Sequence, residues 1–206
     1  MTRFLFIRHA ESVFNAKFRH LIGGRNNAVP LTINGENQAK QLGAHLRNLS
    51  LVPTAVYSSG ATRADSTARI SLKVAGINQS VIIDERLQEV TQGPFENHPR
   101  NEVYTPETIT RYRLSELNGK LPGGESISDV QTRMLNFLSD AYRDYPKDVI
   151  LVFSHGLAIR ALVGALRRYN KSEILNLNTP NVSLTSIVVD DSRQLVEYVG
   201  KTIDLP

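Results

Sequence analysis

The sequence contains no cysteine among its 206 residues, which excludes disulfide bonds, thiolate metal ligands and a cysteine nucleophile. It also lacks any apolar run long enough to span a membrane. The first apolar run, Phe4–Ile7, is too short to be the core of a signal peptide. We therefore expect a cytoplasmic protein without a membrane partner.

Several functional motifs are missing as well. There is neither a phosphate-binding loop ending in Gly-Lys-Ser/Thr nor a Gly-x-Gly-x-x-Gly turn after a strand, so we expect no nucleotide cofactor. The paired histidines of a His-Glu-x-x-His zinc site and the Gly-x-Ser-x-Gly nucleophile turn are also absent. Lys and Arg are scattered and the net charge is only +4, which fits a small anionic substrate and gives no indication of nucleic acid.

Strand-like and helix-like patterns alternate along the chain, which favours an α/β protein: a three-layer α/β/α sandwich with a mostly parallel central sheet. The length fits a single domain, residues 1–206. Strands are predicted at residues 4–7, 55–57, 81–83 and 149–153, with a terminal hairpin of 183–189 and 194–199. Apolar residues at helical spacing follow Thr32 and recur at 61–72, 127–141 and 156–166, which predicts four helices. We expect a long loop at 15–30. A cap-like excursion is expected at about 90–124, with a helix near 107–118.

Two histidines come directly after buried apolar runs. Arg8-His9 follows Phe4–Ile7, and Ser154-His155-Gly156 follows Val149–Phe153. Ligands of open α/β sheets bind outside the carboxyl ends of such strands, so both histidines are candidates for one site. Arg8 would hold an anion and keep the neighbouring imidazole neutral, as a nucleophile requires. A histidine in this position can also serve the structure alone.

The helix expected after His155 adds a second anion-binding element. We expect the amides of Gly156 and Leu157 to point into the crevice at the helix N-terminus and to favour a bound anion. Arg63 lies in the first turn of another predicted helix, where a cation opposes the helix dipole unless an anion binds nearby. Glu89 follows the strand at 81–83 and is a candidate general acid, although its pattern also fits a surface glutamate. Arg25, in a glycine-containing loop, is either a substrate contact or an exposed loop residue.

Six segments in order resemble the histidine phosphatase superfamily, in its phosphoglycerate mutase-like branch. They cover residues 3 to about 189, and together they are far more specific than any one motif. The matching residues are Arg8-His9-Ala10-Glu11-Ser12 with Asn15; Pro30-Leu31-Thr32 with Gly35 and Gln38-Ala39; Ser58-Ser59 with Arg63-Ala64 and Thr67-Ala68; Leu87-Gln88-Glu89 with Gly93 and Glu96; Gly124-Glu125-Ser126 with Asp129 and Arg133; and Val152–Gly156 with Ile159-Arg160.

The resemblance implies phosphoryl transfer through a covalent phosphohistidine on His9. By this analogy Arg8, Arg63 and His155 surround the phosphoryl oxygens, and Glu89 protonates the leaving oxygen and then activates water. No metal or other cofactor is implied. We expect Ser12, Asn15, Arg25 and Gly156 to contact a small phosphorylated substrate, and we expect that the protein could form a homodimer.

The chain also departs from the family pattern. Gly60 stands in place of a proline, and Phe95-Glu96-Asn97 stands in place of Trp-Glu-Gly. Gly24–Asn27 differs from the turn that many members have there, which helps to recognise the substrate. The excursion before Gly124 is short for a mutase, which must exclude water while a bisphosphate reorients. We therefore expect a phosphomonoesterase. The alternatives are a 2,3-bisphosphoglycerate-dependent phosphoglycerate mutase, a non-catalytic phospho-ligand binder, and a metallohydrolase that uses His9, His155 and Glu89.

Overall fold

The computed structural model describes residues 1–203, in which six strands form one sheet. Its order is β3-β2-β4-β1-β5-β6, and β3, β2, β4 and β1 run parallel while β5 and β6 are antiparallel to their neighbours. The bounds are Thr2–Arg8 for β1, Ala55–Ser58 for β2, Val81–Ile83 for β3, Val149–Ser154 for β4, Leu184–Val189 for β5 and Gln194–Lys201 for β6. The predicted strands, the terminal hairpin and the mostly parallel sheet are thus confirmed.

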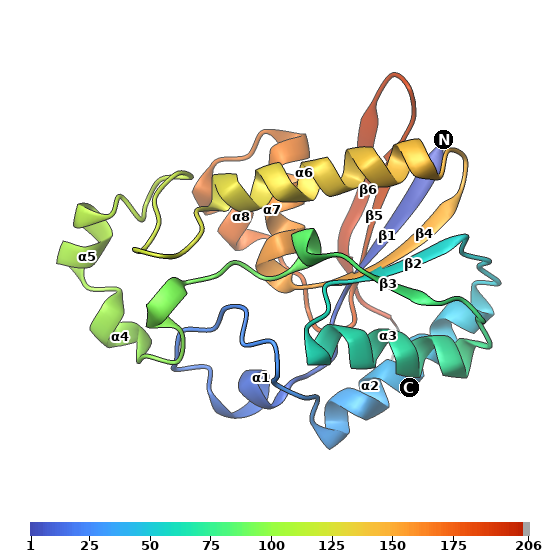
Figure 1. Ribbon diagram of the computed structural model, residues 1–206, viewed down its shortest axis with the longest axis horizontal. Coiled ribbons are helices and arrows are strands. Elements are labelled where there is room, and N and C mark those ends of the chain that lie inside the picture. Colours follow the sequence, from blue (N-terminus) through green and yellow to red (C-terminus); the bar gives the residue numbers. More distant parts are fainter. Residues whose placement is uncertain (204–206) are drawn as a thin grey trace.

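Helices cover both faces of the sheet (Figure 1). On one face lie α2 (Ile33–Asn48) and α3 (Thr62–Ala75), and on the other α6 (Ile127–Asp144) and α7 (Gly156–Arg167). Strand β1 explains why its sequence is apolar without interruption: Phe4 and Phe6 enter the core under α6 and α7, and Leu5 and Ile7 enter the core under α2 and α3. Each such buried side chain stabilises the fold by about 1.5–3 kcal/mol relative to an exposed one.

Local capping fixes where the helices begin. Thr32 Oγ1 accepts from the amide of Gly35 at 2.9 Å, which confirms the predicted start of α2. Helix α6 begins with a reciprocal cap, in which Ser126 Oγ accepts from the amide of Asp129 and the Asp129 carboxylate accepts from the amide of Ser126. A short helix, α8 (Lys171–Asn176), follows α7 and was not predicted from the sequence; Asn170 caps it.

The loop after β1 is less irregular than the sequence indicated. Helix α1 (Val13–Lys17) occupies its start, so the prediction of a continuous loop at 15–30 is wrong at that end. The side chains of Ser12 and Asn15 each accept a hydrogen bond from the backbone amide of the other residue, and this reciprocal cap stabilises the single turn of α1. The helix was missed because its residues show no hydrophobic periodicity.

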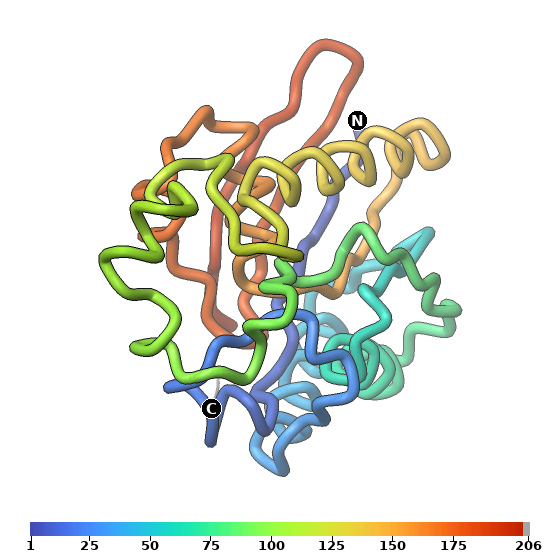
Figure 2. The backbone as a smooth tube through the Cα atoms, turned by 60° about the vertical axis from the view of Figure 1, so that its left-hand side comes forward, coloured from blue at the N-terminus to red at the C-terminus, as the bar shows by residue number. Residues whose placement is uncertain are grey.

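Residues 90–124 form an excursion beyond the carboxyl ends of the parallel strands. It contains α4 (Arg100–Val103) and α5 (Pro106–Arg111), and the latter is shorter than the helix predicted near 107–118. The chain leaves the helix because Arg113 adopts a left-handed φ of 52°. The excursion lies beside the loop after β1 in both views (Figures 1 and 2), where the amide of Ile22 donates to the carbonyl of His98. Within residues 1–203, no helix is both long enough and apolar enough to cross a membrane.

Candidate active site

The site lies where β1, β4 and β2 end side by side. Strands β1 and β4 are parallel neighbours, with Arg8 opposite Ser154, so the following residues His9 and His155 meet at the same edge. Their ring centroids are 5.1 Å apart. The structure therefore brings together the two histidines that the sequence placed after separate strands, and β2 adds Ser59 on the other side of β4, with its Oγ 2.8 Å from His155 Nε2.

The ring of His9 is held in one tautomer. Its Nδ1 lies 2.7 Å from the carbonyl oxygen of Ala10. Because a carbonyl oxygen only accepts hydrogen bonds, Nδ1 must carry the hydrogen and Nε2 must carry the lone pair. Burial lowers the pKa of His9 well below its ordinary value, and the charges of Arg63 and Arg8 lower it further. The ring is therefore neutral, and its Nε2 has the properties of a nucleophile.

His155 lies fully buried beneath this site. Its Nε2 is bonded to Ser59, whereas its Nδ1 has no hydrogen-bond partner among the residues that the structure describes. Burial lowers the pKa of His155 well below the ordinary value, with contributions from Arg63 and His9. A buried ring nitrogen without a protein partner is costly unless a ligand satisfies it. His155 itself is 0% exposed and is not part of the lining of the cavity that contains His9.

Two arginines supply the positive charge: Arg63 is buried and Arg8 is partly buried. Arg8 donates from Nη1 to the carbonyl of Thr179 at 2.8 Å, and its buried Nε is without a partner in residues 1–203. Arg63 lies in the first turn of α3, as predicted, and donates to the carbonyls of Gly24, Arg25 and Asn26. Burial lowers the pKa of both guanidiniums, while the charge of Glu89 opposes that shift. An anion placed between them would offset the cost of burying two like charges.

Glu89 occupies the helix N-terminus that was expected to bind the substrate. Its carboxylate accepts from the amides of Leu157 and Ala158, each at 3.1 Å, and from the amide of Val90 at 3.0 Å. The predicted role of the Leu157 amide in holding a substrate anion is therefore wrong, because a carboxylate of the chain itself takes that position. Gly156 instead lets Arg8 approach the helix, since a Cβ there would lie 3.3 Å from Arg8 Nε.

The remaining predicted residues divide into two groups. Ser12 and Asn15 cap α1 and line the same cavity as His9. The side chain of Arg25 lies 3.2 Å from Glu125 and is not part of the lining of that cavity, so its expected substrate contact is not what the structure places there. The main chain of Arg25 does contribute, because its carbonyl accepts from Arg63. Sequence reasoning missed Asn181, whose Nδ2 donates to the carbonyl of His9 at 2.8 Å; a lone Asn after a loop gives no signal of this role.

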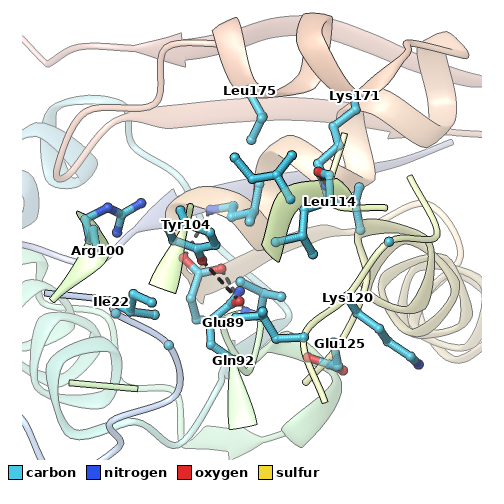
Figure 3. Close-up of a pocket in the computed structure, with 18 of the residues that line it drawn as sticks. Ile22, Glu89, Gln92, Arg100, Tyr104, Leu114, Lys120, Glu125, Lys171 and Leu175 are labelled. Carbon is cyan, nitrogen blue, oxygen red and sulfur yellow. Dashed lines mark hydrogen bonds between the residues drawn. The ribbon is translucent and has the colours of Figure 1, made fainter. Parts of the chain in front are cut away.

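Two adjoining cavities open at this edge of the sheet. The smaller has a volume of about 230 Å³ and is lined by Arg8, His9 and Arg63 together with Asn15. The larger, about 410 Å³, lies between the excursion and helices α7 and α8 (Figure 3). Four residues line both: Gly23, Gly24, Glu89 and Arg100. The larger cavity could not be predicted from the sequence, because it depends on how the excursion packs.

The described residues include no group of three or more His, Asp or Glu side chains arranged to hold a metal ion. The metallohydrolase alternative therefore has no ligand cluster in residues 1–203. In particular, the carboxylate of Glu89 binds backbone amides.

The arrangement of these site residues agrees with a comparison of the chain with known protein families. The model of the histidine phosphatase superfamily (branch 1) matches residues 4–202. The chain belongs to this superfamily. The resemblance drawn from the six motifs is thus confirmed.

Named relatives of this superfamily member differ in what their names say they do. A probable phosphoglycerate mutase, GpmB, of Erwinia tasmaniensis is 32% identical over 190 residues, covering 91% of this chain and 85% of the relative. The structure of Bacillus stearothermophilus YhfR is similar with a TM-score of 0.85, 25% identity and 98% of each chain covered. A phosphoserine phosphatase mutant of Entamoeba histolytica, in complex with phosphoserine, shares the fold with a TM-score of 0.81, 22% identity and 96% of each chain covered.

The two neutral histidines of the site should make the stability of this protein depend on pH. In the unfolded chain a histidine takes up a proton near pH 6.5, whereas burial and the arginines hold the folded pKa of His9 and His155 well below that value. Stability present above pH 6.5 is therefore lost as the pH falls toward the folded pKa values, at up to about 1.4 kcal/mol per pH unit for each ring.

This dependence is measured by urea unfolding at intervals between pH 7.5 and 5. The slope of unfolding free energy against pH gives the number of protons taken up on unfolding. Below pH 6.5 we expect this number to be smaller by about one in His9→Asn than in the wild-type protein. A wild-type free energy that stays flat through this window would show that the rings are not neutral in the folded protein.

Proposed function

We propose that this protein is a phosphomonoesterase that works through a covalent phosphohistidine on His9. One observation carries the proposal: a buried imidazole, fixed as the tautomer with a free Nε2, lines a cavity together with Arg8, Arg63 and Glu89. Phosphoryl transfer is mostly a matter of positioning and electrostatic stabilisation, and these residues supply both.

In the first half-reaction, the phosphate ester binds between Arg8 and Arg63, and His9 Nε2 attacks phosphorus in line with the leaving oxygen. The N–P bond forms as the P–O bond breaks, and Glu89 gives a proton to the leaving oxygen. We assign to the Nδ1 atom of His155, which is buried and has no partner in residues 1–203, a hydrogen bond to a phosphoryl oxygen, with Nε2 accepting from Ser59 Oγ. One such preorganised contact typically contributes about 10²–10³ in rate.

In the second half-reaction, water attacks the phosphohistidine from the position that the alcohol has left. Glu89 takes the proton of that water, phosphate departs, and His9 regains its lone pair while the Nδ1–H bond to Ala10 holds the ring. The same carboxyl group is therefore acid and then base. Its place on the lining of both cavities supports this double role.

A cofactor-primed phosphoglycerate mutase is the second candidate, because a relative covering most of the chain is named as a probable one. A mutase must hold its intermediate while excluding water. In this chain the helices of the excursion over the site are short, namely two α-helices of four and six residues and a 3-10 helix of three, and the smaller cavity continues into a larger one. We therefore favour transfer to water.

The test supplies 3-phosphoglycerate with a trace of 2,3-bisphosphoglycerate and follows phosphate and 2-phosphoglycerate together. A phosphatase releases phosphate faster than it isomerises the substrate, and an activated aryl phosphate should be hydrolysed equally with and without a chelator. Isomerisation that outpaces phosphate release would instead establish the mutase. A protein that binds phosphate esters but releases no phosphate from any of them would be a non-catalytic binder.

A further inference from the structure

The larger cavity adjoins the phosphoryl site through Glu89. It is bounded by the excursion on one side and by α7 and α8 on the other, and Figure 3 shows Leu175 and Lys171 extending from α8 toward Leu114 of the excursion. Its volume of about 410 Å³ lies within the range of roughly 300–1,000 Å³ that is typical of ligand pockets. An ester whose phosphate lies against His9 would place its bridging oxygen near Glu89 and its alcohol in this larger cavity.

The walls of this cavity are largely apolar. Val90, Tyr104, Ile109, Leu114, Leu157 and Leu175 are among the residues that line it. Ile109 on α5 and Leu175 on α8 remain 37% and 46% exposed although both are large apolar side chains. Two exposed apolar side chains on opposite walls of one cavity are well placed to be covered by an apolar ligand.

The cations of the cavity are mostly engaged elsewhere. Lys120 is paired with Asp129 at 2.8 Å, and Lys171 donates to the carbonyls of Leu114 and Glu116. Arg100 stacks over the ring of Tyr104 at 5.5 Å and lines both cavities, so its charge is near the phosphoryl end.

The one carboxylate on the far wall, Glu125, is bound by Arg133 and Arg25. Among the residues described, both lysines of this cavity thus already donate to acceptors of the protein, which leaves them fewer donors for a second anionic group on the substrate.

We propose that the larger cavity binds the leaving group, and that the substrate is the monoester of an apolar alcohol, aryl or branched aliphatic. This inference rests on the proposed phosphatase function. A glycerate or serine leaving group would bring a carboxylate into a chamber whose lysines are already engaged, and burying a charge without a partner is costly. An apolar alcohol instead covers Ile109 and Leu175, and its oxygen receives the proton of Glu89.

The test compares two esters of primary alcohols, so that leaving-group chemistry is matched. For the wild-type protein, kcat/KM for 2-phenylethyl phosphate should exceed that for 3-phosphoglycerate by at least about tenfold, since one methylene in an apolar pocket already contributes about 10-fold or more. Acetyl phosphate, corrected for its spontaneous hydrolysis, is too small to reach the far wall and reports on the phosphoryl site alone.

Leu175→Gln and Ile109→Gln should each lower the ratio of kcat/KM for 2-phenylethyl phosphate to that for acetyl phosphate by about tenfold. Leu195→Gln is the matched control, because Leu195 is 44% exposed on β6 and is outside the lining of the cavity. It should leave the ratio unchanged. Since all three side chains are partly exposed, the variants should fold.

The proposal is overturned if the wild-type protein prefers 3-phosphoglycerate, or if both cavity variants leave the ratio at its wild-type value. Hydrolysis of acetyl phosphate in that case preserves the phosphatase function and rejects only the apolar leaving group. If the wild-type protein hydrolyses none of the three compounds, the phosphatase function itself is rejected along with the inference.

Discussion

His9→Ala should lower kcat for phosphate release by about 10⁴ or more, because it removes the Nε2 atom that we propose attacks phosphorus. Losses of this size are typical when a covalent nucleophile is removed from an otherwise intact site. The substitution also removes a buried ring and its 2.7 Å hydrogen bond to Ala10, but it relieves the proximity of that ring to two arginines. We therefore expect a folded protein that still binds phosphate esters.

Three measurements separate chemistry from folding: steady-state phosphate release, ligand binding by calorimetry, and thermal unfolding. His45→Ala is a suitable control, because His45 lies in the last turn of α2 and lines neither of the two cavities. It should change kcat less than twofold. Activity of His9→Ala within tenfold of wild type would remove His9 from the role of nucleophile.

Glu89→Gln should slow esters of poor leaving groups by about 10²–10⁴ while slowing p-nitrophenyl phosphate much less. The amide keeps one oxygen, which can accept from Val90 and Ala158, whereas the NH2 group that replaces the other oxygen loses the bond from the amide of Leu157. That loss should affect good and poor leaving groups alike. What is lost is the transferable proton, and an alcohol of high pKa needs that proton far more than nitrophenol does.

The measurement is kcat/KM for a series of phosphate esters whose leaving groups differ in pKa. In the variant, kcat/KM should fall more steeply with rising leaving-group pKa than in the wild-type protein. Glu85→Gln serves as the control, since Glu85 is exposed in the turn that follows the same strand. It should reproduce the wild-type slope. Equal slowing of good and poor leaving groups in Glu89→Gln would count against Glu89 as the acid.

The sequence was sufficient to predict the sheet and the clustering of the charged groups. Uninterrupted apolar runs such as Phe4–Ile7 indicate strands buried on both faces, and the carboxyl ends of parallel strands share one edge. This placed His9 and His155 at the same edge of the sheet without any knowledge of the order of the strands. The confirmed family resemblance then assigned expected roles to Arg63 and Glu89 that their local patterns left open.

What the sequence could not predict depends on contacts between distant segments. The position of Glu89 on the N-terminus of α7 joins residues 68 and 69 apart in the chain. Asn181 reaches the carbonyl of His9 across 172 positions. Arg25 was expected to contact substrate because it lies in a loop, but its side chain meets Glu125 instead. Hydrophobic periodicity carries no information about such pairs.

The structure of the excursion could not be predicted from the sequence either, for the same reason. Arg113, two residues after α5 ends, has a left-handed φ of 52°, and the cavity wall that faces the excursion includes Lys171 and Leu175 of α8, a helix that periodicity did not reveal. The cavity between them is therefore a tertiary feature. Its apolar wall is the basis for the class of substrate that we propose.

The most direct test of the central claim is to trap the covalent intermediate. Wild-type protein mixed with an ester carrying a radioactive phosphoryl group, and quenched in alkali during turnover, should carry label that is stable to base, is released by acid, and maps to the peptide containing His9. His9→Ala should carry none. Rapid turnover by the wild-type protein without any such label, or label on a different residue, would contradict the account.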